Sequence, residues 1–364
     1  MTKTTRVMLA VLAVCGTSAA LAQSSVTLYG RVNTSIEHQK LGNASATGLV
    51  SNSSFIGFRG TEDLGNGLKA GFILESQFNS DNGTGTADNG GVNFTRQSEL
   101  NLSGDFGMLR LGTFDPYSYS VTADAISMHN HDTGPSADML YSGVLWGGNK
   151  IAYRTPTFAG FDAEVQYQFG EKATLDDKDP NGNITTPGAW ENKGGWDLGV
   201  NYANGPLGLG FGYSEYKKNA TAAGLAANLS NEKDSQFALR ASYELGDLTL
   251  GAYYQQQKFK EAGSSEKRNV YRLAAKYVIG ASELHANIGR ADKWKVNGAK
   301  EGKAPTQWTL AYNYNLSKRT KVYALYSSIN NAQESEIGSG SFNLSTQEDS
   351  YKFRTFGVGI RHFF

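Results

Sequence analysis

The sequence predicts an all-β protein: a transmembrane, sixteen-stranded, antiparallel up-and-down β-barrel with a long third loop folded inward. Three observations predict this fold class. Apolar and polar residues alternate in short stretches along the whole chain. Short turns alternate with long polar connections. Beyond the N-terminal segment, no apolar run approaches the roughly 20 residues that a membrane-spanning helix needs, and glycine (43), tyrosine (19) and phenylalanine (18) are abundant while proline (7) is scarce.

The N-terminal segment has the layout of a cleaved secretory signal. Lys3 and Arg6 precede an apolar run at 7–14, and small residues follow. We expect residues 1–22 to be removed and residues 23–364 to form one barrel domain. Loss of the two basic residues takes the formal net charge from 0 to −2. That balance gives no reason to expect a nucleic-acid partner.

Cys15 allows a second interpretation of the same segment. In "LAVCG" it would be the lipid-carrying residue of a lipoprotein signal, but Val14 fits poorly before such a cysteine and the apolar run would be very short. Cys15 is the sole cysteine of the chain. The exported protein is therefore expected to lack disulfides, and other interactions must stabilise it.

The predicted strands alternate with two kinds of connection. The strands are expected to begin near residues 25, 52, 68, 92, 108, 148, 161, 194, 207, 234, 248, 268, 283, 305, 320 and 350. Short turns lie at 63–67, 104–107, 155–160, 204–206, 245–247, 279–282 and 316–320. Long polar loops are expected at 39–51, 80–92, 114–147, 171–193, 219–233, 259–267, 293–304 and 331–349. Turns at one end and long loops at the other are typical of an outer-membrane barrel, whose tilted strands need ~9–11 residues to cross.

Each strand has one apolar and one polar face. The stretch 306–316 carries on one face Trp308, Leu310, Tyr312, Tyr314 and Leu316. A soluble β-sandwich would alternate too, but it would not need aromatic residues near the ends of so many apolar faces, as a membrane girdle does. An unpaired strand edge is costly in hydrocarbon, so the first strand, 25–38, must pair with the last.

The last strand ends in two phenylalanines. In "FRTFGVGIRHFF" the expected lipid-facing residues are Phe356, Val358, Ile360 and Phe364. Arg361 is expected to face the lumen, and His362 to lie at the membrane rim, where a polar group reaches headgroups or water. The alternation assigns Phe363 no contact. The terminal carboxylate is expected at the membrane edge, because burying it would be costly.

The third long connection is the candidate constriction of a water-filled lumen. A sixteen-stranded barrel is wide enough to hold water, so a pore for water-soluble molecules is the expected function. The stretch 114–145 contains no Lys or Arg but four acids, Asp115, Asp124, Asp132 and Asp138. Charged residues of neighbouring strands complete the candidate constriction: Glu75, Arg59, Arg96, Arg110, Lys150 and Arg154. An inward loop would set acids against an arginine wall and create a transverse field; an outward loop would leave the acids as solvated surface.

Four stretches together resemble the general porins of Gram-negative bacteria, of the betaproteobacterial type. They are "SSVTLYGRV" after the signal, "FIGFRGTEDLGNGLKAGFILES" at 55–76, "FTRQSELNLSGDFGMLRLGTFD" at 94–115 and "GVGIRHFF" at the end. The resemblance implies a homotrimer of sixteen-stranded barrels in the outer membrane, each with an inward third loop. It also implies that a terminal phenylalanine, here Phe364, is read by the barrel-assembly machinery.

The resemblance further implies a constriction lined with arginines, matched here by Arg59, Arg96 and Arg154. Simple alternation would put Arg96 on the lipid face, so a β-bulge would have to turn it inward. The chain departs from the family at Thr113, where a basic residue is common, and Asp115 follows. This departure lowers the positive charge near the constriction, so we expect only mild ionic selectivity.

Passive diffusion of small hydrophilic solutes and ions is the expected function. The alternative is a substrate-specific channel for anions such as dicarboxylates, or for sugars. Tyr117, Tyr119 and Tyr141 of the third loop could stack against sugars, although packing of the loop against the wall explains them as well. A purely structural or adhesive barrel would suit a narrower fold.

An enzyme is not expected, because no convergent nucleophile and base can be assembled from the sequence. The densest titratable cluster is His129, His131 and Asp132, which is weak evidence for a metal because no second His or Cys pair accompanies it. The glycines of "GLGFGY" at 208–213 fall inside a strand pair, so close packing or an open lumen is expected there rather than a nucleotide. No cofactor is predicted.

Overall fold

The computed structural model describes residues 25–85, 87, 90–127, 140, 147–172, 177–178, 184–186, 190–218, 233–261, 263–332 and 351–364. Sixteen strands form the wall of one closed barrel. They are β1 (Ser25–Leu41), β3 (Ser54–Gly65), β4 (Leu68–Phe78), β5 (Gln97–Gly104), β6 (Gly107–Thr113), β7 (Lys150–Arg154), β8 (Phe161–Gln168), β12 (Trp190–Asn204), β13 (Leu207–Lys218), β14 (Lys233–Leu245), β15 (Leu248–Glu261), β16 (Ser264–Ile279), β17 (Ser282–Ala291), β20 (Thr306–Asn315), β21 (Thr320–Ala332) and β22 (Tyr351–Phe363). The predicted fold class is confirmed.

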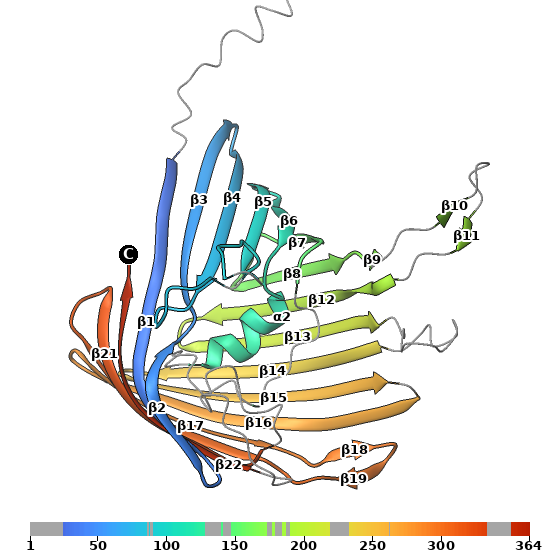
Figure 1. Ribbon diagram of the computed structural model, residues 1–364. Coiled ribbons are helices and arrows are strands. Elements are labelled where there is room, and N and C mark those ends of the chain that lie inside the picture. Colours follow the sequence, from blue (N-terminus) through green and yellow to red (C-terminus); the bar gives the residue numbers. More distant parts are fainter. Residues whose placement is uncertain are drawn as a thin grey trace, which may run out of the picture.

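Short elements occupy the connections between wall strands. They are β2 (Ala44–Ser51), β9 (Glu171–Lys172), β10 (Asp177–Lys178), β11 (Ile184–Thr186), β18 (Trp294–Val296), β19 (Ala299–Glu301), the α-helix α2 (Tyr117–Tyr119) and the π-helix η1 (Ser120–Asp124). Among the described residues, no helix is long and apolar enough to cross a membrane. Figure 1 shows the strands curving as one sheet around α2.

The barrel closes between the first and the last strand. On one side β1 pairs antiparallel with β22, from Arg31↔Phe363 to Leu41↔Phe353. On the other side β1 pairs with β3 over Ser25–Arg31. Every remaining wall strand pairs antiparallel with its chain neighbour. This closure leaves no open edge, as the hydrocarbon environment requires.

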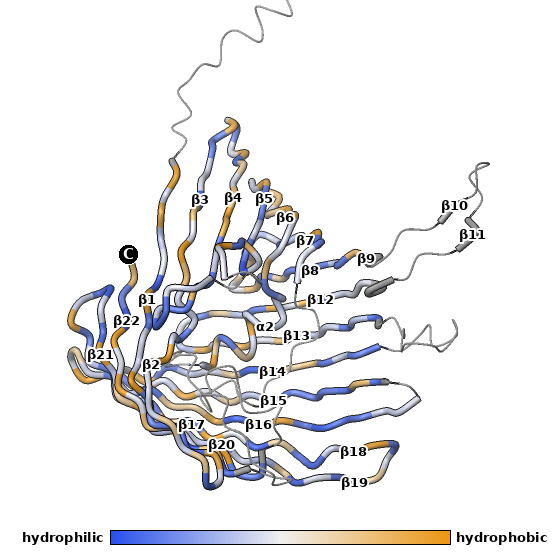
Figure 2. The backbone as a smooth tube through the Cα atoms, viewed as in Figure 1, coloured by the Kyte–Doolittle hydropathy of each residue, from blue (hydrophilic) through white to orange (hydrophobic). Residues whose placement is uncertain are grey.

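The alternation of apolar and polar residues separates the two faces of the wall. On β1 the inward side chains of Asn33, Ser35 and Glu37 are buried, whereas the outward Val26 and Ile36 are 65% and 55% exposed. Figure 2 shows hydrophobic and hydrophilic residues interleaved along the strands. Membrane barrels have this pattern, because lipid replaces water on the outside and polar groups line the inside.

Four expected loops contain paired strands instead. The predicted loop 259–267 is a hairpin in which β15 and β16 pair as far as Glu261↔Ser264, and the predicted loop 171–193 contains the paired β10 and β11. The predicted loop 39–51 is a hairpin, in which β1 continues to Leu41 and β2 pairs with it from Thr34↔Ser51 to Leu41↔Ala44. The predicted loop 293–304 contains the β18–β19 hairpin, which pairs with β16 through Lys267↔Lys295. These four loop predictions were wrong because polar composition does not prevent backbone pairing, which only needs an extended partner.

Inner-face glycines make room for the third loop. A Cβ at Gly210 of β13 would lie 2.0 Å from the carbonyl oxygen of Val121, and one at Gly212 would lie 2.7 Å from the Cβ of Ser118. A side chain at either position would push the loop away from the wall. The glycines of "GLGFGY" therefore serve close packing of the backbone.

Candidate channel constriction

The described start of the third loop lies inside the barrel, against β8, β12 and β13. The backbone N–H of Ser118 donates to the Oδ1 of Asp197 on β12 at 2.9 Å, and the Ser118 hydroxyl donates to the other carboxylate oxygen. The hydroxyl of Tyr117 donates to the Asp162 carboxylate on β8. These bonds attach α2 to the inner wall (Figure 1).

Two further bonds hold the backbone just before α2. The Nζ of Lys150 donates to the carbonyl of Phe114 at 2.9 Å, and the Nε2 of Gln166 donates to the carbonyl of Asp115 at 3.0 Å. Both donors are buried side chains of the wall. The loop therefore turns inward directly after β6, because its first carbonyls find their partners in the lumen.

The loop then follows the wall. Ala123 and Ile126 are fully buried and pack with Ala238, Tyr253 and Ala274 of β14, β15 and β16. Further along, Leu140 is buried in a cluster with Leu41, Val270, Ala291, Ile329 and Phe353. The loop segments that the structure describes thus cover the inner face from β8 to β16 and beyond.

A second group of inward side chains lies on β1, β3 and β4. Glu75 accepts a hydrogen bond from the Tyr29 hydroxyl at 2.7 Å and forms an ion pair with the Nε of Arg96 at 2.9 Å. The Arg96 guanidinium also lies 4.7 Å from the ring centroid of Phe55. Arg59 lies 4.8 Å from the ring centroid of Tyr29, a cation–π arrangement.

Arg96 reaches the lumen side without the expected bulge. It precedes β5, which begins at Gln97, so strand alternation does not fix its direction. Its side chain meets Glu75, and Glu75 pairs across the sheet with the inward Gly57. The lipid-side placement inferred from simple alternation is therefore wrong, because the residue is not part of the strand.

Arg110 and Arg154 converge on one carboxylate. Arg110 forms ion pairs with Glu164 at 2.8 Å and with Glu99 at 2.7 Å, and it lies 4.1 Å from the ring centroid of Phe114. It is only 9% exposed. Arg154 meets the other oxygen of Glu164 at 2.7 Å. The charge of Arg110 is thus largely neutralised beneath the loop, whereas Arg154 keeps about a third of its side chain exposed.

The strand order places the arginine of β3 opposite the helical part of the loop. Arg59 is on β3, and η1 packs against β12, β13 and β14. β3 and β14 lie eight strands apart in the ring of sixteen, so they face each other across the lumen. Asp124, the last residue of η1, is half-buried on the loop side. The predicted acids Asp132 and Asp138 lie outside the described residues.

Asp115 lies between the two groups. The residue is exposed, although neighbouring protein atoms crowd its carboxylate. This crowding raises the pKa of Asp115, while the positive charges of Arg96 and Lys150 act in the opposite direction. Asp115 therefore takes up a proton at higher pH than an ordinary aspartate.

Several inward basic residues were missed by the motif-based reasoning. Arg31 donates to the carbonyl of Ser53 at 2.8 Å, Arg240 donates to that of Leu209 at 2.9 Å, and Arg272 lies 5.6 Å from the ring centroid of Tyr253. Each occupies an inward position of its strand. Strand parity alone would have found them, because inward residues of a barrel recur at every second position.

The loop tyrosines are packed. The ring of Tyr117 lies 4.2 Å from the Arg154 guanidinium and against Gly199. Tyr119 packs beside the cluster of Ala123 and Ile126. Tyr141, His129, His131 and Asp132 lie outside the described residues. Within the part of the chain that the structure describes, no three His, Cys, Asp or Glu side chains are arranged to hold a metal ion.

A closed barrel with an apolar exterior, a polar interior and a loop segment inside its lumen is a membrane channel for water-soluble molecules. The chain belongs to the Gram-negative porins: the sequence model of that family matches residues 8–334. Outer membrane porin protein 32 of Delftia acidovorans is 34% identical, with 100% of both chains covered. Major outer membrane protein P.IB of Neisseria meningitidis serogroup A is 31% identical, covering 94% of this chain and 95% of the relative.

Solved structures of outer-membrane proteins have the same fold. The anion-selective porin from Comamonas acidovorans matches with a TM-score of 0.69 and 29% identity, covering 94% of this chain and 100% of that one. OmpT of Vibrio cholerae in its trimer form matches with a TM-score of 0.65 at 20% identity, which supports the fold alone. The predicted family and outer-membrane location are confirmed, and the protein is an outer-membrane porin.

Proposed function

We propose that this porin is a general diffusion channel for small hydrophilic solutes and ions, narrowed by a charged constriction with a mild preference for anions. Arg59 supports this most directly. Arg96, Arg110 and Arg154 are each paired with a carboxylate. Arg59 is exposed to the lumen, stacks on Tyr29 and has no carboxylate within salt-bridge distance among the described residues. Its charge therefore acts on passing solutes.

The preference is expected to be mild because the other three predicted constriction arginines are balanced by carboxylates. Glu75 offsets Arg96, and Glu164 together with Glu99 offsets Arg110 and Arg154. The relative from Comamonas acidovorans is described as anion-selective. The preference that we propose for this chain is for the same sign of ion. The packed tyrosines of α2 give no support to a sugar-binding channel. We propose no catalytic activity, because the full-length relative from Delftia acidovorans is named as a porin.

Channel recordings in planar bilayers test this function. Wild type is expected to conduct in proportion to salt concentration, with a small reversal potential in a salt gradient that favours anions. Arg59→Gln is expected to move that potential toward zero or toward cations, because it removes the unpaired guanidinium. Lys69→Gln, an exposed charge beside a short turn, is the matched control. Absence of channel events, or a strong preference for either ion sign in wild type, would contradict the proposal.

We also propose that the barrel assembles as a homotrimer and that its last strand is recognised during insertion. The N–H of Phe364 donates to the carbonyl of Gly30 at 3.2 Å, and the N–H of Gly30 donates back at 3.3 Å. The terminal residue thus lies on the closing seam, where an assembly factor would meet it. Phe363 also has a contact, since the Arg361 guanidinium lies 5.3 Å from its ring centroid.

A further inference from the structure

We propose that Arg240 of β14 is a second ion-selecting residue of this channel, and that anions pass between it and Arg59 on the opposite wall. This inference deepens the proposed function and rests on it. No sequence motif pointed to Arg240. Three structural features support its role: its hydrogen-bond partners are neutral, its guanidinium is held in place, and it lies across the lumen from Arg59.

Arg240 is not neutralised by a carboxylate. Its Nη2 donates to the carbonyl oxygen of Leu209 at 2.9 Å and to the side-chain oxygen of Asn201 at 3.3 Å. Among the described residues, no carboxylate lies within salt-bridge distance of Arg240. The carboxylate of Asp162 accepts a hydrogen bond from the other end of the Asn201 amide, at 3.0 Å. A neutral amide therefore separates this negative charge from the guanidinium.

The glycines of β13 hold the guanidinium of Arg240 against the wall. Arg240 pairs across the sheet with Gly210. A Cβ at Gly210 would lie 3.2 Å from the Nε of Arg240, and one at Gly208 would lie 3.3 Å from its Nη2. The guanidinium thus packs over backbone that carries no side chains, and two hydrogen bonds fix it there. A charge that is already fixed acts on a solute without first having to order a mobile side chain.

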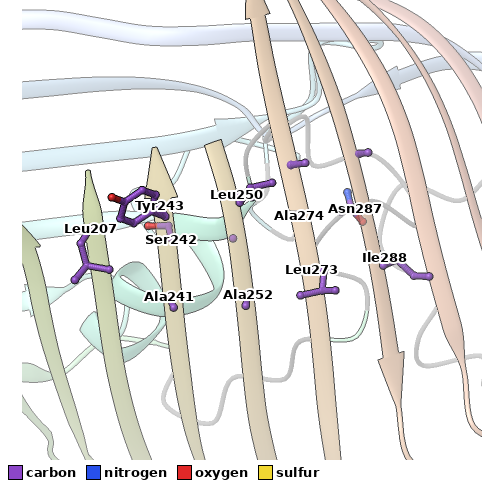
Figure 3. A pocket seen from close by; sticks show the side chains of 13 residues that line it. Leu207, Ala241, Ser242, Tyr243, Leu250, Ala252, Leu273, Ala274, Asn287 and Ile288 are labelled. Carbon is purple, nitrogen blue, oxygen red and sulfur yellow. The ribbon is translucent and has the colours of Figure 1, made fainter. Parts of the chain in front are cut away.

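Arg240 faces the lumen, next to the third loop. Its neighbours Leu239 and Ala241 are exposed on the lipid side, where Ala241 lines an apolar hollow of the outer wall (Figure 3). Ala238 points inward like Arg240 and packs against the loop residue Ala123. Arg240 follows Ala238 by two residues toward the short turn after Leu245. The half-buried Arg240 therefore lies on the turn side of η1, where the loop does not cover it completely.

Arg59 and Arg240 lie on opposite walls at nearly the same height. Their strands, β3 and β14, are eight apart in the ring of sixteen. Arg59 lies six residues before the end of β3 at Gly65, and Arg240 lies five residues before the end of β14 at Leu245. Both strands end at short turns, which share one rim of a membrane barrel. With about 3.3 Å per residue and a tilt of about 35–45°, the two heights differ by roughly 2–3 Å.

A second guanidinium changes the field that a solute meets. Loop acids facing arginines on one wall would produce mainly a transverse field, which orients a solute. Arg240 adds positive charge on the loop side, so the potential between Arg59 and Arg240 favours anions at the centre of the passage. Asp124 of η1 lies on the same side as Arg240 and keeps this preference mild.

Reversal potentials in planar bilayers test the role of Arg240, in a KCl gradient near ~0.1 M, where screening acts over roughly 10 Å. Arg240→Gln is expected to lower the chloride-to-potassium permeability ratio about 2-fold, the effect of one unit charge roughly 10 Å from an ion in water. Arg59→Gln is expected to lower it by a similar factor, and the double variant about 4-fold, because distant charges act additively. Arg290→Gln is the matched control, since Arg290 is exposed and pairs with the outward Tyr271.

Two further variants separate the charge of Arg240 from a structural role. Arg240→Lys loses the guanidinium bonds to Leu209 and Asn201 but retains the charge, so the permeability ratio should stay near that of wild type. Arg240→Cys should behave like Arg240→Gln. A positively charged methanethiosulfonate should then restore the anion preference, and a negatively charged one should lower it further. Cys15 is the sole cysteine and belongs to the segment expected to be removed, so it does not compete for the reagent.

Equal permeability ratios in wild type and Arg240→Gln, or an equal loss in Arg290→Gln, would overturn the role of Arg240. An equal loss in Arg240→Lys and Arg240→Gln would overturn it too, because a structural role would explain both. If Arg240→Gln does not fold, opposite effects of the two reagents on folded Arg240→Cys support the role, and equal effects overturn it. A wild type that forms no channels, or that prefers cations, would instead contradict the proposed function before any variant is compared.

Discussion

The surroundings of each inward side chain decide whether its charge reaches a solute. Arg110 and Arg59 have the same guanidinium, but Arg110 is buried beneath Phe114 between two carboxylates, whereas Arg59 lies on a tyrosine ring facing the lumen. In a narrow water-filled passage with low-dielectric walls, an unpaired charge acts over a longer range than a paired one. Counting the arginines near a constriction therefore overestimates the electric field that a passing solute experiences there.

A single residue, Asp115, is expected to make the ion selectivity of the channel depend on pH. Its pKa is raised above the ordinary Asp value of about 3.9, so it takes up a proton as pH falls toward that value from above. Protonation removes a negative charge from the constriction. We expect the anion preference to increase on acidification, beginning above pH ~4, when reversal potentials are recorded from neutral to acidic pH.

Asp115→Asn is the control for this effect. At neutral pH it should already show the stronger anion preference of acidified wild type, and it should lack the additional change on acidification. A change that starts only below the ordinary Asp range, or that persists in the variant, would mean that another group is responsible.

At the scale of elements, the third loop and the glycine-rich strands fit each other. α2 and η1 can approach β12 and β13 because Gly199, Gly210 and Gly212 present no side chains there. Hydrogen bonds from Ser118 and Tyr117 then fix the approach. The two features act together, since the N–H of Ser118 reaches the Asp197 carboxylate at 2.9 Å only when α2 lies close to β12.

A methyl group at Gly210 tests this fit. Gly210→Ala would place Cβ 2.0 Å from the Val121 carbonyl oxygen, and overpacking against backbone costs about 1–3 kcal/mol. We expect η1 to shift into the lumen and single-channel conductance to fall. Gly289→Ala, whose nearest neighbour would be 3.3 Å away at a side-chain oxygen, should leave conductance nearly unchanged. Identical conductance in both variants would contradict the close fit.

For the whole molecule, the decisive contact is the seam between the first and last strands. β1 and β22 pair over eleven positions, and the backbone of Phe364 extends the pairing to Gly30. The outward residues of the last strand, Phe356, Val358 and Ile360, are exposed as a lipid-facing series should be. The outward His362 ends near Thr320, at 2.8 Å from its hydroxyl.

Deletion of Phe364 is expected to lower the yield of assembled barrels and to leave the conductance of those that form unchanged. The reason is that the seam loses two backbone hydrogen bonds and its terminal ring, whereas the constriction lies elsewhere. The measurement is the heat-modifiable folded fraction in outer membranes, followed by single-channel recording. Phe364→Tyr retains the ring and backbone and should assemble normally. A normal yield from the deletion would remove the assembly role.

Local sequence patterns were enough to predict the barrel, its sixteen strands, the face of each alternating residue and the closing pair of strands. These properties follow from local alternation and from the need to satisfy every backbone group in hydrocarbon. Three features appear only in the folded molecule: which arginines are neutralised, how Arg96 turns inward and where loops become hairpins. Those features depend on which residues lie opposite each other across strands, and register is set by the packing of the whole sheet.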